Sequence, residues 1–307
     1  MMEWTRRDLA GAGLGLIVPP PSGRDGAPSP ASQDFAVEAR HRGWLTAPVR
    51  IDAGGPYAFA VDSAANASVI ASDLVEPLAL RPGPDIGMHT LIAREVVRTV
   101  RAGRLQTGAL DVPEPRLAVA SRRAMGGLDG LLGVDLLAGL RLDLAFRGAR
   151  RLRVSRSRRT PGGYLDGPRP TARMVRAAGQ RFGLLMIEAR LNGESALAIV
   201  DTGALVSIAN TALARAAGAL PVVVGDGGAN RVLSPTGRSA GATLMIFPNV
   251  QFAGLSLLGT PMLVGDYHTF DLWGLANRPA FLMGIDLLSQ FESVAIDLGR
   301  GEVLFEL

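Results

Sequence analysis

The chain has 307 residues, of which 48% are hydrophobic, 5% aromatic and 20% charged, a size that predicts about two domains. It has neither cysteine nor lysine, which excludes disulfides, thiol nucleophiles, cysteine-ligated metals and Schiff-base lysines. The formal charge is +4, and the three histidines, His41, His89 and His268, are too scattered to favour a histidine metal site or a serine triad. Aspartate and glutamate remain as the plentiful reactive groups, and we expect neither a cofactor nor a metal.

The first segment, 1–34, has the pattern of an export signal. Arg6 and Arg7 precede a short apolar run at 11–18 and three prolines at 19–21. This order resembles a twin-arginine signal and predicts a periplasmic or extracellular protein. The run is far shorter than the roughly 20 residues that cross a bilayer, so we expect no membrane span. A tail with a chance Arg-Arg pair is the alternative.

The first of two similar units is expected at 35–155. Its landmarks in chain order are an aspartate that ends an apolar strand (Asp62), an apolar marker around a glycine (131–137) and a hairpin pattern (140–154). The aspartate of the marker, Asp135, is expected to cap the short helix that follows it.

An arginine-rich linker is predicted at 156–180. The wider stretch 147–181 holds eleven arginines and one acidic residue, and it is broken by prolines and glycines. A nucleic-acid-binding face would place aromatic side chains among the arginines, whereas Tyr164 is the only aromatic residue here. We therefore expect a solvated linker and no nucleic-acid partner. A tether to an acidic or membrane surface is the alternative.

The second unit is expected at 181–307 and repeats the landmarks of the first. They are the aspartate (Asp201), the apolar glycine marker (282–288) and the final hairpin (291–307). Asp286 takes the place of Asp135 in the marker and is likewise expected to cap a short helix.

The two units align closely around their aspartates. Setting Asp62 against Asp201 brings Ser63 opposite Thr202. Helical patterns are few, chiefly 72–80, 210–217 and the short turns after the two markers. The sequence therefore predicts an all-β protein with two pseudo-symmetric lobes and an active-site cleft between them.

The repeated motif resembles that of the retropepsin-like aspartic proteases, with two retroviral-protease-like halves in one chain. It reads Asp-Thr-Gly at 201–203 and Asp-Ser-Ala at 62–64, each copy ending an apolar strand and each followed by an apolar-Gly-x-Asp-Leu-Leu marker. The resemblance covers about residues 44–154 and 182–307. It implies β lobes of the retropepsin or pepsin type, an aspartic endopeptidase acting on peptides or unfolded proteins, and a monomer that contains its own pseudo-dimer.

By this resemblance Asp62 and Asp201 are the catalytic pair. Two carboxylates a few Å apart share one proton, so one acts as a base on water while the other acts as an acid toward the scissile carbonyl. Ser63 and Thr202 are expected to hydrogen-bond across the pseudo-twofold axis and lock the turns. Gly203 is expected to allow close backbone approach and a positive φ.

The first turn departs from the family pattern at Ala64, where the family has glycine. A positive φ here would strain an alanine by about 1 kcal/mol and displace the first carboxylate. Ala65 and Ala204 stand where many pepsin-like enzymes have a serine or threonine that donates to the carboxylate. Without this hydroxyl the carboxylate pKa is lowered less, which predicts an activity optimum at mildly acidic pH, at about 4.5–6.5.

The middle segments of both units are expected to form flaps over the substrate. They are the turn-rich stretches 87–98 and 226–241. The residues expected to bind substrate are Ala65, Asn66, Ala204, Gly228 and Gly237. His268 is expected in a surface loop.

Two further functions remain open at this point. A pseudoprotease would bind peptides in the same cleft by strand addition without cutting them, and Ala64 favours this reading. An adaptor tethered by the arginine-rich stretch would bind in a salt-dependent way, indifferent to either aspartate.

Overall fold

The computed structural model describes residues 32–36, 43–148, 150–157, 172–176, 179–181, 183–222 and 230–307. In this part of the chain strands predominate and the α-helices are short, which confirms the all-β, two-lobe class. The export signal expected at 1–34 lies outside the described residues, apart from the start of β1 (Ser32–Ala36). No helix in the described ranges is long and apolar enough to cross a membrane.

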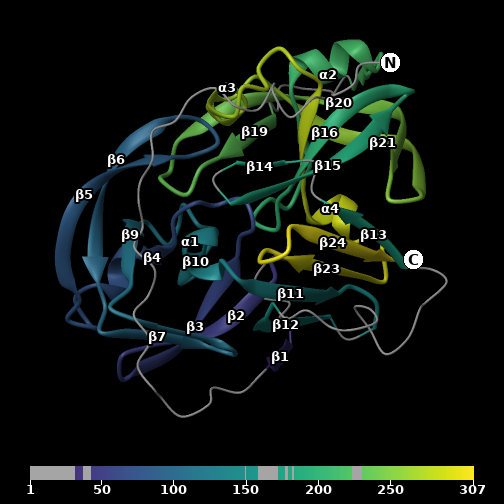
Figure 1. The fold of residues 1–307 in the computed structure, drawn as a ribbon. Helices are drawn as coiled ribbons and strands as arrows, with labels where there is room; N and C mark the ends of the chain where they lie inside the picture. Colours follow the sequence, from purple (N-terminus) through teal and green to yellow (C-terminus); the bar gives the residue numbers. More distant parts are fainter. Residues whose placement is uncertain are drawn as a thin grey trace.

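The first lobe is a nine-stranded sheet in the order β5-β6-β9-β4-β10-β3-β2-β7-β8 (Figure 1). Its strands are β2 (Thr46–Ile51), β3 (Gly54–Val61), β4 (Val69–Ala71), β5 (Arg81–His89), β6 (Arg94–Arg101), β7 (Arg104–Thr107), β8 (Leu110–Pro113), β9 (Arg116–Ala120) and β10 (Gly130–Leu132), and helix α1 (Val134–Leu137) follows. The marker strand β10 runs parallel to β3, with Leu132 beside Val61. This pairing buries the marker directly under the end of β3, because both strands are apolar on both faces.

The second lobe repeats this arrangement. Its sheet has the order β14-β15-β16-β22-β17-β21-β20-β18, with β19 paired to β20. The elements are β14 (Gly179–Arg181), β15 (Leu184–Leu191), β16 (Glu194–Val200), β17 (Ile208–Ala209), α2 (Thr211–Ala216), β18 (Leu220–Pro221), β19 (Asn230–Leu233), β20 (Ser239–Phe252), β21 (Leu255–Val264), α3 (His268–Leu272), β22 (Ala280–Met283) and α4 (Ile285–Leu288). The marker strand β22 is parallel to β16, with Met283 beside Val200, as Leu132 is beside Val61.

A third, six-stranded sheet joins the lobes in the order β1-β12-β11-β23-β24-β13. The two predicted hairpins supply four of its strands: β11 (Leu140–Ala145), β12 (Arg151–Arg156), β23 (Ser293–Asp297) and β24 (Glu302–Glu306). They meet where β11 pairs antiparallel with β23, placing Leu142 beside Ile296. Figure 1 shows β11, β23 and β24 below the second lobe and beside β2 and β3 of the first lobe.

The range expected to be a linker, 156–180, contains strand structure. β13 (Ala172–Arg176) pairs with β24, and β14 begins at Gly179 and pairs with β15. An edge strand such as β24 exposes unpaired backbone groups, and β13 satisfies them. Residues 158–171 of the expected linker lie outside the described residues.

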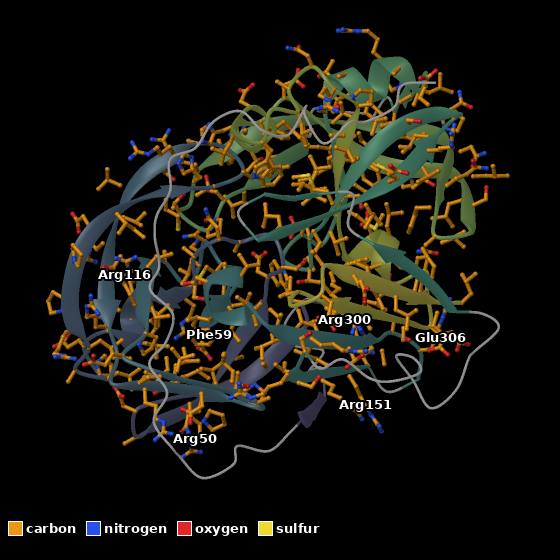
Figure 2. The ribbon with its side chains drawn as sticks, in the orientation of Figure 1. Arg50, Phe59, Arg116, Arg151, Arg300 and Glu306 are labelled. Carbon is orange, nitrogen blue, oxygen red and sulfur yellow. The ribbon has the colours of Figure 1, made fainter. Side chains whose placement is uncertain are left out.

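Burial follows the strand alternation that the sequence predicts. Phe59 on β3 is fully buried inside the first lobe, whereas Arg50 and Arg116 are exposed on its surface (Figure 2). One hydrophobic cluster runs through both lobes and the shared sheet. The helix predicted at 72–80 is instead a 3₁₀ turn at Ser72–Leu74 followed by turns, since Pro77 lacks the N–H that a longer helix needs.

Candidate active site

The two motif aspartates lie at the ends of equivalent strands and line one cleft. Asp62 follows β3 and Asp201 follows β16, and their backbone N–H groups donate to Leu132 (2.9 Å) and Met283 (3.0 Å) of the marker strands. Both side chains line a cavity of about 420 Å³ between the lobes. The parallel pairing of each marker with its motif strand therefore fixes where each aspartate emerges.

Reciprocal hydrogen bonds lock the two turns together. The Ser63 N–H donates to Thr202 Oγ1 (3.0 Å), and the Thr202 N–H donates to Ser63 Oγ (3.1 Å). Each hydroxyl in turn donates across the axis, Ser63 to the Val200 carbonyl (2.8 Å) and Thr202 to the Val61 carbonyl (2.6 Å). Both side chains are completely buried, so every one of these groups depends on its partner in the other lobe.

Each carboxylate is held by two backbone N–H groups of its own turn. Asp62 Oδ1 accepts from Ala64 (2.9 Å) and Ala65 (2.8 Å). Asp201 Oδ1 accepts from Gly203 (2.9 Å) and Ala204 (3.0 Å). The two carboxylates therefore have equivalent backbone contacts at nearly equal distances, as a pseudo-twofold axis between the lobes requires.

Burial raises the pKa of both aspartates. For Asp62 the loss of water outweighs the stabilisation from its two backbone donors, so its pKa lies above the ordinary value. Burial, and next the negative charge of Asp62, raise the pKa of Asp201 to about 8. Two carboxyl groups in this condition hold one proton between them over a wide pH range.

Gly203 and Ala64 occupy equivalent positions but have different surroundings. A Cβ added to Gly203 would stand 2.2 Å from Asp62 Oδ2, so only glycine lets this turn approach the first carboxylate. The positive φ expected at Gly203 is not found, and Ala64 also lies outside the positive-φ region. The backbone strain expected from Ala64 is therefore absent, because neither turn has a left-handed backbone at this position. What requires glycine at Gly203 is its short distance to the Asp62 carboxylate.

The marker aspartates do not occupy the N-cap positions of their helices, although Asp286 Oδ1 accepts from the Leu287 N–H in the first turn of α4 (2.9 Å). Ser68 donates to Asp135 through its hydroxyl (2.7 Å) and its N–H (3.0 Å). Ser207 donates to Asp286 in the same way, at 2.6 and 2.9 Å. The residues at the helix N-caps are glycines without a side-chain bond. Each marker aspartate thus ties the segment that follows the Asp62 or Asp201 turn to the marker of the same lobe.

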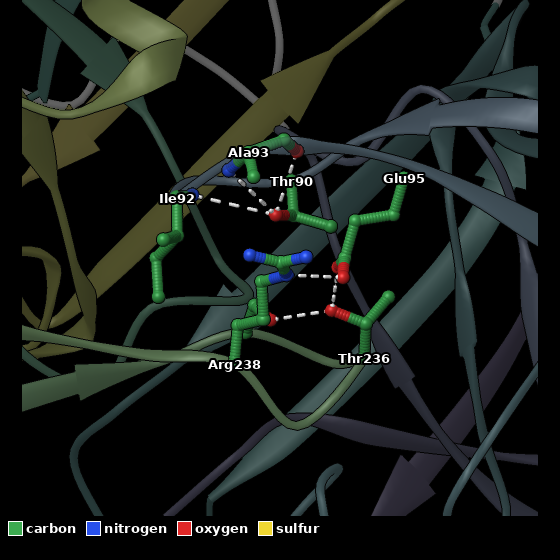
Figure 3. A network of polar contacts seen from close by, with 7 residues as sticks. Thr90, Ile92, Ala93, Glu95, Thr236 and Arg238 are labelled. Carbon is green, nitrogen blue, oxygen red and sulfur yellow. Dashed lines mark hydrogen bonds and ion pairs between the residues drawn. The ribbon is translucent and has the colours of Figure 1, made fainter.

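Two hairpins from opposite lobes form a roof over the cleft, and we call β5–β6 and β19–β20 together the roof. Figure 1 shows the tip of β5–β6 reaching toward β19 and α3. Glu95 on β6 accepts hydrogen bonds from the Thr236 hydroxyl and the Arg238 guanidinium in the β19–β20 turn (Figure 3). Burial acts to raise the pKa of Glu95, but these two bonds and the charge of Arg238 lower it overall.

The tip of the first hairpin also contacts α3. His89 Nδ1 lies 2.8 Å from His268 Nε2, and Thr269 donates its N–H to the Leu91 carbonyl at 3.3 Å. Burial, then His268 and Arg94, lower the pKa of His89. The prediction that His268 lies in a surface loop is therefore wrong. His268 is the first residue of α3 and contacts His89 of the other lobe.

The residues expected to bind substrate are only partly gathered. Ala65, Asn66 and Ala204 line the cleft. Gly237 lies at the tip of β19–β20, where an added Cβ would be 3.8 Å from Ala124 of the first lobe, and it is not part of the cleft wall. Gly228 lies outside the described residues. Among the residues of the described ranges, no His, Cys, Asp and Glu side chains cluster as metal ligands.

Sequence reasoning missed one residue that contacts the turn after Asp201. Trp44, just before β2, lines the cleft and donates its indole N–H to the Gly203 carbonyl at 2.8 Å. Its neighbour Gly43 has φ +96°, and the Gly43 carbonyl accepts from Arg150. A lone tryptophan outside the repeated motif gave no signal. The equivalent position in the second lobe holds Leu184, which has no side-chain hydrogen-bond donor.

Comparison with known protein families identifies part of the first lobe. Residues 47–136 match the family model described as aspartyl protease, a range that includes Asp62 and residues 131–136 of the first marker. No curated protein matches the chain. The second lobe lies beyond the matched range, yet it carries the same strand, turn, marker and carboxylate. The first lobe therefore matches the aspartyl proteases, a family of peptide hydrolases, and the chain has the two-lobe, aspartic-protease-like fold.

Proposed function

We propose that this protein is an aspartic endopeptidase that hydrolyses peptide bonds of extended polypeptides with Asp62 and Asp201. The observation that carries the proposal is the pair of buried carboxylates on turns locked by reciprocal Ser63 and Thr202 bonds, both with a raised pKa. One chain supplies both halves, so we expect a monomer. The pattern of the first 34 residues supports an exported protein.

The chemistry needs one carboxylate and one carboxylic acid on the two sides of the scissile bond. The ionised carboxylate takes a proton from a bound water as the water oxygen attacks the carbonyl carbon. The protonated partner gives its proton to the carbonyl oxygen, which forms a neutral tetrahedral diol. The C–N bond then breaks as the amine nitrogen takes up a proton from the dyad. The raised pKa of the pair keeps one proton available for this cycle.

The cleft favours apolar side chains next to the bond that is cut. Apolar residues from both lobes line it, namely Met88, Leu91, Met125, Leu128, Leu131, Leu205, Val206, Ile208, Val232, Leu233, Leu263, Leu272, Trp273 and Leu282. Burying a leucine or phenylalanine side chain there is worth about 1.5–3 kcal/mol. We therefore expect cleavage between large apolar residues of an unfolded chain.

The test is digestion of a denatured casein-like protein by the purified full-length chain across pH 3–8, beside Asp201→Asn. The account expects cleavage that is strongest at about pH 4.5–6.5 and falls at least about 10³-fold in the variant. Equal cleavage by both proteins would refute the aspartic mechanism. Tight peptide binding without cleavage by the folded wild-type chain would instead establish the peptide-binding pseudoprotease.

A further inference from the structure

The two sides of the dyad differ at the peptide group that follows each turn. In the second lobe, the Ala204 N–H of the Gly203–Ala204 peptide donates to Asp201 Oδ1. The carbonyl of that same peptide group, on Gly203, accepts from Trp44 Nε1. A continuous chain of hydrogen bonds therefore runs from the indole through one amide to a catalytic carboxylate.

The first lobe lacks this arrangement. The Ala65 N–H donates to Asp62 Oδ1 in the same way, but no residue in the described ranges donates to the Ala64 carbonyl. The equivalent of Trp44 is Leu184, since Thr46 pairs with Ala60 as Met186 pairs with Ile199. Leucine has no N–H to give. The asymmetry thus comes from one residue of the sequence.

Trp44 is held where this contact requires it. Its ring lies against Gly126, where an added Cβ would stand 2.6 Å from two ring carbons. Gly126 has φ +67°, a conformation that favours glycine. The preceding residue, Gly43, is fixed by the Arg150 bond to its carbonyl (2.9 Å). The indole thus packs against Gly126, and the backbone that leads into Trp44 is tied to Arg150.

Hydrogen bonds in series polarise one another. A donor at the Gly203 carbonyl makes the Ala204 N–H a stronger donor, and a stronger donor stabilises the ionised form of the carboxylate that accepts from it. We propose that Trp44 is a positioning residue for the proposed reaction, which orients and polarises the peptide group that holds the Asp201 carboxylate. The role of Trp44 in catalysis rests on the proposed function. Its effect on the Asp201 carboxylate rests only on the hydrogen bonds described above.

The test is Trp44→Phe, which keeps an aromatic ring on the same Cβ, removes the indole donor, and also removes the ring carbons that lie nearest Gly126. We expect kcat on an apolar peptide to fall about tenfold, with little change in KM. A tenfold fall corresponds to the loss of roughly one hydrogen bond that stabilises the transition state. Both limbs of the pH–rate profile should move to higher pH, because the ionised pair loses stabilisation. Leu45→Met, a volume-conserving change at the fully buried neighbour of Trp44, which does not line the cleft, should leave the limbs in place.

A titration of the aspartate carboxyl carbons by ¹³C NMR reads the same effect without any cleavage. It separates the inference from the proposed function, since an inactive wild-type chain would still titrate. Should Trp44→Phe fold poorly, replacing Trp44 by 3-benzothienylalanine provides a second route, because sulfur takes the place of the indole N–H in a ring system of nearly the same size.

Two outcomes would overturn the role of Trp44. One is a variant in which both carboxyl titrations stay at their wild-type midpoints. The other is midpoints that move toward each other, which would mean that Trp44 only sets the spacing of the carboxylates. A common shift of both to higher pH supports the proposal.

Discussion

At the scale of single residues, the dyad combines a symmetric set of backbone bonds with asymmetric neighbours. Both carboxylates accept from the two N–H groups that follow them, at 2.8–3.0 Å. Gly203 allows close contact with Asp62, whereas Ala64 fills the equivalent place with a methyl group. Function at this site therefore depends unequally on the two turns.

Substitutions at these two positions should have very different effects. Gly203→Ala puts a Cβ 2.2 Å from Asp62 Oδ2, and displacing a catalytic group by about 1 Å costs on the order of 100-fold in rate. Ala64→Gly removes a methyl group from an ordinary backbone conformation and should change kcat/KM by less than about tenfold. Steady-state kinetics of both variants on one peptide makes the comparison. Equal losses would contradict the account.

The raised pKa values of the dyad predict how stability depends on pH. A folded state whose carboxyls resist ionisation binds more protons than the unfolded chain, so stability falls as pH rises from about 4 toward 8. Asp62→Asn removes one buried charge and the repulsion on Asp201. Its Tm should therefore rise relative to wild type as the pH is raised through this range.

The control for this prediction is Asp111→Asn. The hydrogen bond and charge of Arg104 lower the pKa of Asp111, so its contribution has the opposite sign. That variant should lose stability at pH 8 and little at pH 3. A constant Tm difference between Asp62→Asn and wild type at all pH values would count against a dyad that shares a proton.

At the scale of elements, the sequence predicted what is repeated and local. The strands before Asp62 and Asp201, the two markers and the two final hairpins all carry their own apolar pattern and turn residues. The short helix α2 was also predictable, because asparagine is a favoured N-cap residue. In the structure Asn210 caps this helix by accepting from the Leu213 N–H.

Elements that depend on distant partners were not predictable. β13 exists because the edge of β24 is open to it, and α3 is held in part by the Thr269–Leu91 contact. β13 has a structural counterpart in β1, which pairs with β12 as β13 pairs with β24, but no repeated motif marks either strand in the sequence. The Trp44 bond to Gly203 spans 159 positions and has no periodic signature. The site was therefore predictable in its motif and not in what surrounds the motif.

The roof contacts should weaken in acid. The pKa values of Glu95 and His89 are both lowered in the closed arrangement. A lowered pKa means that the contact is stabilising above the group's ordinary pKa and is lost as the pH falls. The neighbouring groups act in the same direction, since His268 and Arg94 both disfavour the charged form of His89 and lower its pKa. Loosening should begin below the ordinary histidine value of 6.5 and continue through the range of Glu95.

Hydrogen–deuterium exchange at the tips of β5–β6 and β19–β20 measures this loosening. After correction for intrinsic rates, exchange should increase between pH 7 and pH 4, and Glu95→Gln should raise it already at pH 7. Glu114→Gln is the matched control, because it breaks an ion pair with Arg81 that is exposed and in the same lobe. Identical exchange at the roof in all three proteins would refute the role of the Glu95 contacts in holding the two hairpins together.

At the scale of the whole molecule, the shared sheet makes the two lobes one unit. β11 and β23 pair along their length, and one hydrophobic cluster runs through both lobes. The dyad sits on the same axis, so its geometry depends on how the lobes are joined. A change in the shared sheet should therefore affect both lobes together.

Leu142→Ala tests this cooperativity. Leu142 is fully buried beside Ile296, and removing a buried leucine side chain costs about 2–5 kcal/mol. Calorimetry should show a single unfolding transition at a lower Tm for the whole chain. Two separate transitions, one of them unchanged from wild type, would show that the lobes unfold independently.

The central claim is that one reaction needs both halves of the chain. Single-turnover cleavage of one apolar peptide by wild type, Asp62→Asn and Asp201→Asn, at pH 5.5 tests it directly. The account predicts that each asparagine variant still binds the peptide but cleaves it at least about 10³-fold more slowly than wild type. Cleavage at near wild-type rate by either variant would contradict a shared dyad, whatever the fold of the two lobes.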